Sequence, residues 1–346
     1  MDPFATRAIG RTGLHVTQLG CGGATLGDIR EVIPESQADV TLEGAHAAGI
    51  GYFDTAPWYG NGRSEHRLGR ILGAKPRESY VLSTKIGRVF FRPSDPQAYV
   101  ASRPTGAAPG ALPFDLRFDY TREGVFRSYE DSLQRLGINT VDALLIHDLD
   151  LGYHKTEEGV AARLDELDRG GGFGALDELK RRGEIRAIGA GINVLGMIPR
   201  FLERFPLDFF LVAMPYTLLE QGALDHELPL CAERGVGVVI GAPFASGILA
   251  RGPDAPSTYG YRPAEAPVVE RTRRIAAVCA RHNVPLGAAA LQFPLGHPSV
   301  ASVIPGPNSP QQVRSNVQWM RTPIPAPLWS ELKGEGLLRP DAPVPD

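Results

Sequence analysis

The feature of this sequence that most constrains its fold is a regular alternation of short apolar, β-branched runs with segments of helical periodicity. Strands that alternate with helices indicate parallel β-α-β units. A closed (β/α)8 barrel requires eight such units, so we predict a single TIM-barrel domain over residues 1–346. The eight candidate strands are residues 15–22, 50–55, 80–87, 141–148, 185–192, 208–215, 236–243 and 300–306.

Helix boundary signals lie between these runs. Ser36, Ser64 and Thr121 each precede a helical pattern and are N-cap candidates. Ser309 and Gln312 have the spacing of a capping box before the last predicted helix. Glycines are expected to end five of the helices, namely Gly49, Gly73, Gly137, Gly183 and Gly235.

Two longer segments, residues 88–120 and 250–267, are rich in proline and aromatic residues. Both follow predicted strands, which places them at the C-terminal face of a barrel. Long loops there are commonly lids or pocket walls, although ordinary surface loops remain an equal alternative.

Charge and cysteine content limit the classes of partner and compartment. The formal net charge is −3, so no basic surplus favours a nucleic acid or an acidic membrane. No apolar stretch has the length of a membrane span or resembles a signal peptide. Three dispersed cysteines without a CxxC motif favour a reducing cytoplasm and indicate no metal site. A small-molecule partner is expected, and the oligomeric state stays open.

Reactive side chains stand at the ends of three neighbouring predicted strands. Asp54, Lys85 and His147 each lie at such an end, and Tyr59 follows Asp54 by five residues. The C-terminal strand ends of a barrel meet at one mouth, so the four side chains are expected together. Singly, each has an ordinary explanation: a solvated loop charge, a capping cluster around His147, or a packed aromatic. Their convergence favours a catalytic set.

These four residue types have a coherent acid-base chemistry. A phenol with a pKa near 10 is a poor catalyst at neutral pH, and a nearby ammonium favours its phenolate. Lys85 can supply that ammonium, held by Asp54 through a charge-assisted hydrogen bond. Tyr59 would then protonate a carbonyl oxygen during hydride delivery, or take a proton from an alcohol in reverse. His147 and Trp58 are the candidate substrate contacts.

At these residues the sequence resembles the aldo-keto reductase family. The resemblance runs from GRTGLHVTQLGCGGATLG near the start to SVIPGPNSPQQVRSNV near the end. The stretch FDTAPWYGNGRSEHRLGRIL is its most specific part, and STKIG and VDALLIHDLD follow in the expected order. The resemblance implies a barrel with a catalytic tetrad of Asp54, Tyr59, Lys85 and His147, in which Tyr59 transfers the proton.

The resemblance also implies a nicotinamide nucleotide, with Asn193 at the nicotinamide amide. Many relatives place a lysine and an arginine around the adenosine 2′-phosphate, where this chain has Gly306 and Gln312. The loss of both cations predicts a preference for NAD over NADP, although Arg314 could still reach a phosphate. Further implied cofactor contacts are Pro243, Phe244, Gly247, Leu249, Asn308, Ser309 and Asn316.

Within the family, LLIHDLD, MPYTLLEQ and ALQFPLGHPSVASVIPG resemble the aldose 1-dehydrogenase branch. That branch includes L-fucose, D-threo-aldose and L-galactose dehydrogenases and the pyridoxal 4-dehydrogenases. The implied reaction oxidises the anomeric C1 hydroxyl of an aldose to a lactone. Open alternatives are a pyridoxal 4-dehydrogenase, a general aldehyde or ketone reductase, a barrel that only senses nicotinamide nucleotides, and a Schiff-base aldolase using Lys85.

Overall fold

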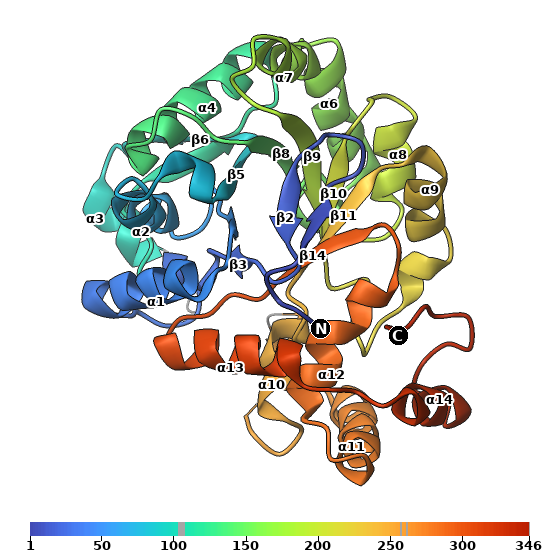
Figure 1. The fold of residues 1–346 in the computed structure, drawn as a ribbon. Coiled ribbons are helices and arrows are strands. Elements are labelled where there is room, and N and C mark those ends of the chain that lie inside the picture. Colours follow the sequence, from blue (N-terminus) through green and yellow to red (C-terminus); the bar gives the residue numbers. More distant parts are fainter. Residues whose placement is uncertain (103–107, 257, 261, 346) are drawn as a thin grey trace.

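The computed structural model describes residues 1–102, 108–256, 258–260 and 262–345, and its core is a parallel β-barrel (Figure 1). Every strand pairing in the barrel sheet is parallel. Leu19 forms a bridge to Val303 that joins the two edge strands. The predicted (β/α)8 barrel is therefore confirmed. In spatial order its strands are β14 (Val300–Ile304), β11 (Gly237–Gly241), β10 (Phe209–Ala213), β9 (Ala187–Ile192), β8 (Ala143–His147), β5 (Val81–Ile86), β4 (Tyr52–Asp54) and β3 (Cys21–Gly22).

Each predicted run contributes one barrel strand, but the first run is divided. Only Cys21–Gly22 joins the barrel, whereas His15–Thr17 forms β2 and pairs antiparallel with β1 (Thr6–Ala8). Ile9, Leu14 and Val16 of this hairpin are buried in one apolar cluster with barrel residues. The run is divided because its first half fills the barrel interior with side chains instead of extending the ring.

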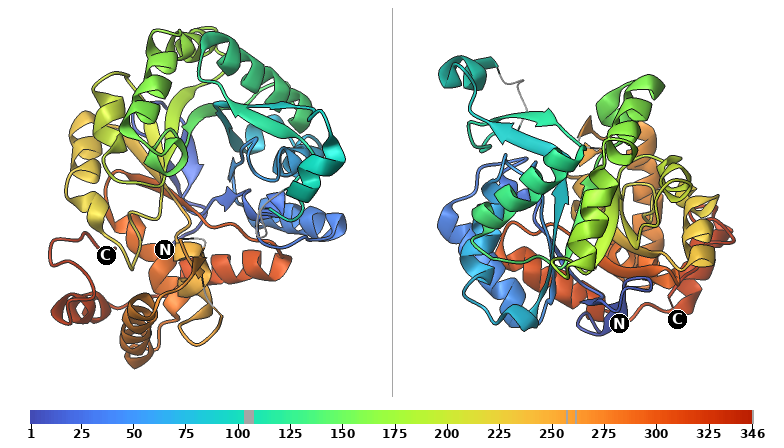
Figure 2. Two further views of the ribbon diagram at one scale, coloured as in Figure 1. Left: turned by 180° about the vertical axis from the view of Figure 1, so that it is seen from behind. Right: turned by 90° about the horizontal axis from the view of Figure 1, so that it is seen from above.

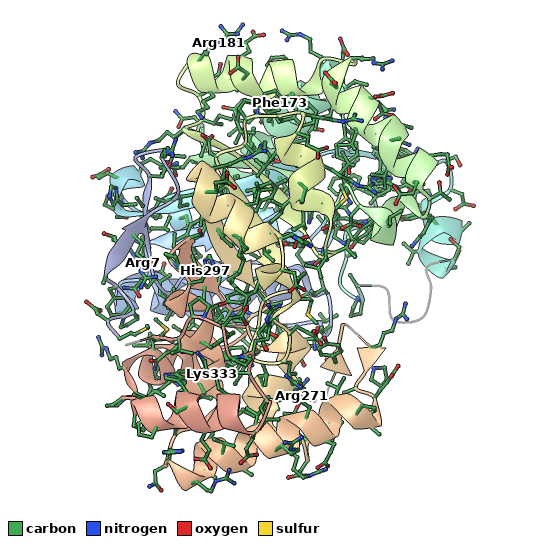
Figure 3. All side chains as sticks on the ribbon, turned by 90° about the vertical axis from the view of Figure 1, so that its right-hand side faces the viewer. Arg7, Phe173, Arg181, Arg271, His297 and Lys333 are labelled. Atoms are coloured by element: carbon green, nitrogen blue, oxygen red, sulfur yellow. The ribbon has the colours of Figure 1, made fainter. Side chains whose placement is uncertain are left out.

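A half-buried guanidinium fixes the hairpin to the segment around the start of β14. Arg7 Nη1 donates to the backbone oxygens of Leu295 and Val300, at 2.9 and 3.0 Å. Figure 3 shows Arg7 beside His297, which lies between Leu295 and Val300 in the sequence. The N-terminal segment therefore covers the barrel end from which β14 begins, and it leaves the opposite end for the site.

Helices surround the sheet in the views of Figures 1 and 2. They bury apolar faces against it, so that one continuous core lies between the sheet and its helical layer. No described helix is both long and apolar enough to cross a membrane. The helices outside the two long segments include α1 (Glu35–Ala48), α2 (Arg63–Leu72), α4 (Arg122–Leu136), α6 (Glu157–Asp168), α7 (Gly172–Arg181), α8 (Met197–Leu202), α9 (Glu227–Arg234), α11 (Ala266–Arg281), α12 (Leu286–Gln292), α13 (Pro310–Arg321) and α14 (Ala326–Gly334).

The predicted N-caps are partly correct. The side chains of Thr121 and Ser309 accept hydrogen bonds from backbone N–H groups at the starts of α4 and α13. Ser36 is wrong as a cap because α1 begins at Glu35, so that Pro34 is the N-cap residue and Ser36 already lies inside the helix. Ser64 is also wrong, because its hydroxyl donates to the Gly23 oxygen at 2.7 Å from inside α2.

The helix ends follow the sequence more closely. The five helices end directly before, or two residues before, the predicted glycines. Gly49, Gly137 and Gly235 adopt left-handed C-cap conformations with φ of 105°, 61° and 66°. A left-handed C-cap strongly favours glycine, which explains why this signal was reliable.

The two long segments fold on the C-terminal face of the barrel. In the first, β6 (Arg88–Phe91) pairs with β7 (Asp115–Phe118), with α3 (Pro96–Ser102) between them. The right-hand view in Figure 2 shows this hairpin projecting opposite the two termini. The second begins within α10 (Ile248–Arg251) and contains β12 (Thr258–Tyr259) and β13 (Arg262–Pro263). Residues 103–107, 257 and 261 of these segments lie outside the described residues.

Candidate active site

Three neighbouring barrel strands present Asp54, Lys85 and His147 at one mouth. Asp54 and His147 are the last residues of β4 and β8, and Lys85 is the penultimate residue of β5 between them. Lys85 Nζ donates to Asp54 Oδ2 at 2.6 Å and to the Thr55 oxygen at 2.8 Å. Asp54 and Lys85 are almost fully buried, so their pairing is little screened by water. The ammonium is thus held in one position.

Tyr59 lies on the turn after β4 and faces this pair. Lys85 Nζ is 4.8 Å from the centroid of the Tyr59 ring. The His147 ring stands edge-on to the Tyr59 ring, with centroids 5.7 Å apart and planes at 90°. The structure therefore brings together the four side chains that strand-end reasoning grouped.

Burial shifts the pKa values of the two groups that flank Lys85, Asp54 and His147. Burial raises the pKa of Asp54, against the opposing effects of Lys85 and of a 2.8 Å hydrogen bond from Ser83 Oγ. Burial also lowers the pKa of His147 well below its usual value, and the positive charges of Arg88 and Lys85 act in the same direction. His147 is therefore neutral at physiological pH and can donate an N–H hydrogen bond without carrying a charge.

Sequence reasoning missed two charged residues beside the tetrad, Arg88 and Asp148. Asp148 Oδ2 accepts from Arg88 Nη2 at 3.0 Å and lies 3.2 Å from His147 Nε2. Asp148 Oδ1 accepts from Asn193 Nδ2 at 2.7 Å. The signal for Asp148 was its position directly after a strand-ending histidine, which also allowed a capping role. In the structure Asp150 is the residue that caps the next short helix, α5 (Leu151–His154).

A cavity of about 1200 Å³ extends from the tetrad across the strand ends to the start of α13. Leu249 is fully buried in the core, and Ser309 caps α13, so neither is among the described lining residues. The other predicted substrate and cofactor residues line the cavity: Trp58, His147, Asn193, Pro243, Phe244, Gly247, Gly306, Asn308, Gln312 and Asn316.

The backbone of the cavity fits a dinucleotide. A Cβ on Gly191 would lie 3.6 Å from Lys85 Cε and 3.9 Å from His147 Cδ2, so the glycine keeps a slot open beside both side chains. Ala242, Ala245 and Ser246 have positive φ values of 48°, 47° and 64°. Such strained backbone gathers at ligand clamps, and turns of this kind direct N–H groups at anions. Asn193 and Gly191 thus suit the nicotinamide end and residues 242–247 the pyrophosphate.

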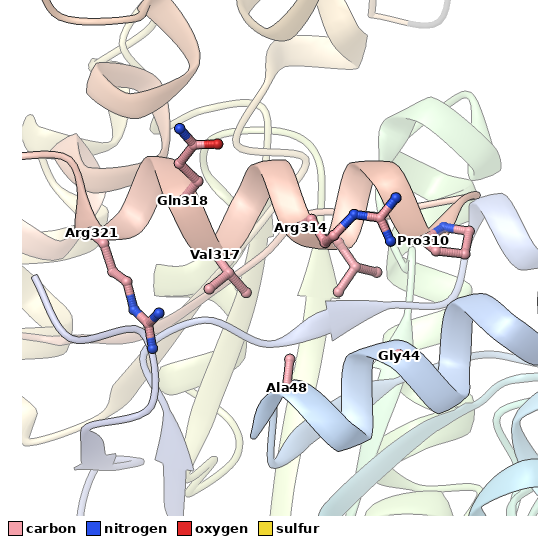
Figure 4. Close-up of a pocket in the computed structure, with 8 residues that line it drawn as sticks. Gly44, Ala48, Pro310, Arg314, Val317, Gln318 and Arg321 are labelled. Carbon is pink, nitrogen blue, oxygen red and sulfur yellow. The ribbon is translucent and has the colours of Figure 1, made fainter.

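The far end of the cavity has a mixed charge. Gly306 and Gln312 line it without a cation, and the Glu31 carboxylate there accepts a hydrogen bond from Asn308. Arg314 lines a different groove, between α13 and α1 (Figure 4). The cationic side chains among the described lining residues come from other segments and are Arg30, Lys85, Arg251 and Arg262.

Comparisons with known proteins agree with this geometry. The sequence profile of the Aldo/keto reductase family matches residues 18–334. A pyridoxal 4-dehydrogenase from Microbacterium luteolum is 42% identical, over 96% of this chain and 97% of its own. A D-threo-aldose 1-dehydrogenase from a Pseudomonas species is 39% identical, over 96% of both chains. The holo form of a Bacillus halodurans aldo-keto reductase superposes with a TM-score of 0.73 at 26% identity, covering 99% of this chain and 98% of its own.

Proposed function

The chain belongs to the aldo/keto reductase family of NAD(P)-dependent oxidoreductases, and from this premise we propose that it oxidises the anomeric C1 hydroxyl of an aldose to a lactone with NAD⁺. The observation that carries the proposal is the clamped ammonium of Lys85, 4.8 Å from the ring centroid of Tyr59 at the cavity mouth. This arrangement supports a tyrosine that exchanges a proton with a substrate oxygen.

Each residue of the tetrad has one proposed task. Tyr59 takes the proton of the C1 hydroxyl, and the Lys85 ammonium favours the phenolate that accepts it. Asp54 and the Thr55 oxygen fix Lys85 in place. His147 donates an N–H hydrogen bond to the substrate oxygen and orients it toward Tyr59. The nicotinamide, when bound, supplies the acceptor for the hydride that leaves C1.

The names of the two relatives point to a common substrate chemistry. Aldoses close to cyclic hemiacetals, and pyridoxal does so through its neighbouring hydroxymethyl group. Loss of hydride from a hemiacetal carbon and of the proton from its hydroxyl gives a lactone in both cases. Half-buried Trp58 offers an aromatic face to an apolar ring face at the cavity wall.

A panel of substrates tests this function. Wild-type protein with NAD⁺ is offered L-fucose, D-arabinose, L-galactose, pyridoxal and simple aldehydes, and reduced cofactor and lactone are measured. We expect an aldose to give the highest kcat/KM. Pyridoxal is the second candidate because of the 42% identical pyridoxal 4-dehydrogenase. The simple aldehydes are also offered with NADH, and a higher kcat/KM for their reduction than for the oxidation of any aldose would contradict the proposal.

The proposed preference for NAD rests on the far end of the cavity. A 2′-phosphate at Gly306 and Gln312 would meet no cation from either residue, and the nearby Glu31 would repel it. Gln312→Arg is expected to raise kcat/KM for NADP⁺ relative to NAD⁺ by about tenfold, because it adds a charge-assisted contact. Gln311→Arg, one residue along α13 and outside the described cavity lining, is the matched control. An NADP⁺ preference in the wild type would refute the assignment.

Two rival functions give different results. A barrel that only senses the nucleotide would show no absorbance change at the nicotinamide band in a single turnover. An aldolase would leave a carbonyl substrate covalently trapped on Lys85 after borohydride treatment. The ion pair with Asp54 opposes the aldolase because it keeps Lys85 charged. We also propose a reducing compartment such as the cytoplasm, since Cys21, Cys231 and Cys279 are free thiols buried in the core.

A further inference from the structure

We propose that Arg88 is a positioning residue for the reaction: by holding the Asp148 carboxylate, it keeps the His147 imidazole uncharged and its N–H available to the substrate oxygen. This inference rests on the proposed function, in which His147 orients the substrate. It concerns residues of β6 and of the turn after β8, outside the tetrad.

One carboxylate connects three functional groups. Asp148 Oδ2 binds the Arg88 guanidinium at 3.0 Å and lies 3.2 Å from His147 Nε2. Its other oxygen accepts from the Asn193 amide at 2.7 Å. Asn193 and His147 both line the cavity, whereas Arg88 is buried behind its wall. The position of Asp148 therefore affects both the substrate contact and the proposed nicotinamide contact.

The arrangement is costly to the fold, which favours a functional role. Arg88 and Asp148 are both almost fully buried, and the desolvation of such a pair offsets much of its attraction. Asp148 also has a φ of +46°, a strained conformation for a residue other than glycine. Arg88 Nε and Nη1 have no hydrogen-bond partner among the described residues. The guanidinium instead lies 5.1 Å from the Trp58 ring centroid and 4.6 Å from that of Tyr153.

Charged side chains from β4, β5, β6 and the turn after β8 surround the His147 imidazole. Lys85 on β5 and Arg88 on β6 are cationic, and both disfavour a protonated imidazole. Asp148 is in direct contact with Nε2 and acts in the opposite direction. Asp54 is paired with Lys85, so its charge is largely balanced.

The other titratable groups named around His147, namely Tyr59, Tyr120 and Asp150, carry no positive charge that could replace that of Arg88. The Tyr59 ring meets His147 edge-on, and the Tyr120 hydroxyl donates to the His147 backbone oxygen. Asp150, two residues after Asp148, uses Oδ1 to cap α5. Removal of the Arg88 charge would therefore leave Asp148 and His147 as an acid-base pair. At low pH the imidazole would take a proton, pair with Asp148 and turn its N–H away from the substrate.

Arg88→Met tests this directly, because methionine is apolar and suits the aromatic surroundings. The pH profile of kcat/KM for the best substrate in the wild type is the reference. In Arg88→Met we expect an additional loss of roughly tenfold relative to that profile between about pH 8 and about pH 5.5, because the unpaired Asp148 carboxylate favours a protonated His147. Arg88→Lys, which keeps the charge, should retain the wild-type profile.

The charge-free control is Arg88→Met combined with Asp148→Asn. Replacing both members of a buried pair avoids the unpaired charge that a single change leaves. The double variant should lose this additional acid-side decline and return to the wild-type profile, although it differs from the wild type at two positions. An additional decline that persists in the double variant, or its absence in Arg88→Met, would overturn the inference. Arg88→Gln serves as a second uncharged variant if Arg88→Met does not fold.

A measurement of the protonation of His147, which does not depend on enzyme turnover, separates this inference from the proposed function. The ring protons of His147, assigned by their loss in His147→Gln, are titrated by NMR between about pH 5 and about pH 9. They should not titrate in the wild type and should titrate in Arg88→Met. A wild type that oxidises no substrate of the panel contradicts the proposed function, while the NMR titration still decides the role of Arg88.

Discussion

Tyr59→Phe is expected to lower kcat by about 10²–10⁴-fold and to leave the dissociation constant for the nicotinamide nucleotide close to that of the wild type. The change removes only the hydroxyl that would exchange a proton with the substrate oxygen. The phenyl ring still occupies the space between Lys85 and His147. Steady-state turnover and a fluorescence titration with NADH measure the two quantities.

Tyr129→Phe is the matched control for this prediction. It removes the same hydroxyl from a buried tyrosine of α4 that is not among the described cavity residues. Turnover of the control should stay within about twofold of the wild type. Equal turnover in Tyr59→Phe and Tyr129→Phe would remove Tyr59 from the mechanism. A loss of nucleotide binding in Tyr59→Phe would show that its role is structural.

Arg67→Met is expected to lower the free energy of unfolding by about 3–5 kcal/mol. Arg67 is 1% exposed and pairs at 2.6 Å with Asp28, which is completely buried. It also donates to the backbone oxygens of Leu26 and Ile33 at 2.7 and 3.0 Å. Its removal leaves a buried carboxylate and two carbonyl groups without these donors. Urea unfolding followed by circular dichroism measures the loss.

The same substitution should also weaken cofactor binding. Arg67 fixes the segment between β3 and α1, and Ile29, Arg30 and Glu31 of that segment line the cavity. Arg70→Met is the matched control, because Arg70 pairs with Glu35 and Asp39 at the exposed surface. The control should cost less than about 1 kcal/mol. Similar losses of unfolding free energy in both variants would show that the buried Arg67–Asp28 ion pair stabilises the fold no more than the exposed pairs of Arg70.

Much of the fold was predictable because barrel strands carry a strong local signal. Each of them is a short apolar run bounded by turn residues, and in a parallel barrel both faces are buried. The strand ends were predictable for the same reason, so Asp54, Lys85 and His147 could be grouped. The division of residues 15–22 was not predictable, since a hairpin that fills the barrel interior has the same apolar composition as a barrel strand.

The incorrect caps and the missed residues depended on tertiary contacts. Ser64 is a residue type typical of caps, but its hydroxyl is hydrogen-bonded to Gly23 and Thr55, which directly follow the adjacent strands β3 and β4. Leu249 was inferred as a cofactor contact from the family resemblance, yet it lies in α10 and is fully buried in the core. Arg88 resembled an ordinary charge after a strand, and only its contact with Asp148, 60 residues away in the chain, gives it a role.

The most direct test of the proposed reaction is the mass of the reduced cofactor after turnover with a C1-deuterated aldose. L-fucose or D-arabinose deuterated at C1 is incubated with the protein and NAD⁺, and the cofactor and sugar products are analysed by mass spectrometry. We predict one deuterium in each reduced nicotinamide and an equal amount of lactone. Reduced cofactor without deuterium, or no reduced cofactor while the sugar is consumed, would contradict hydride transfer from the anomeric carbon.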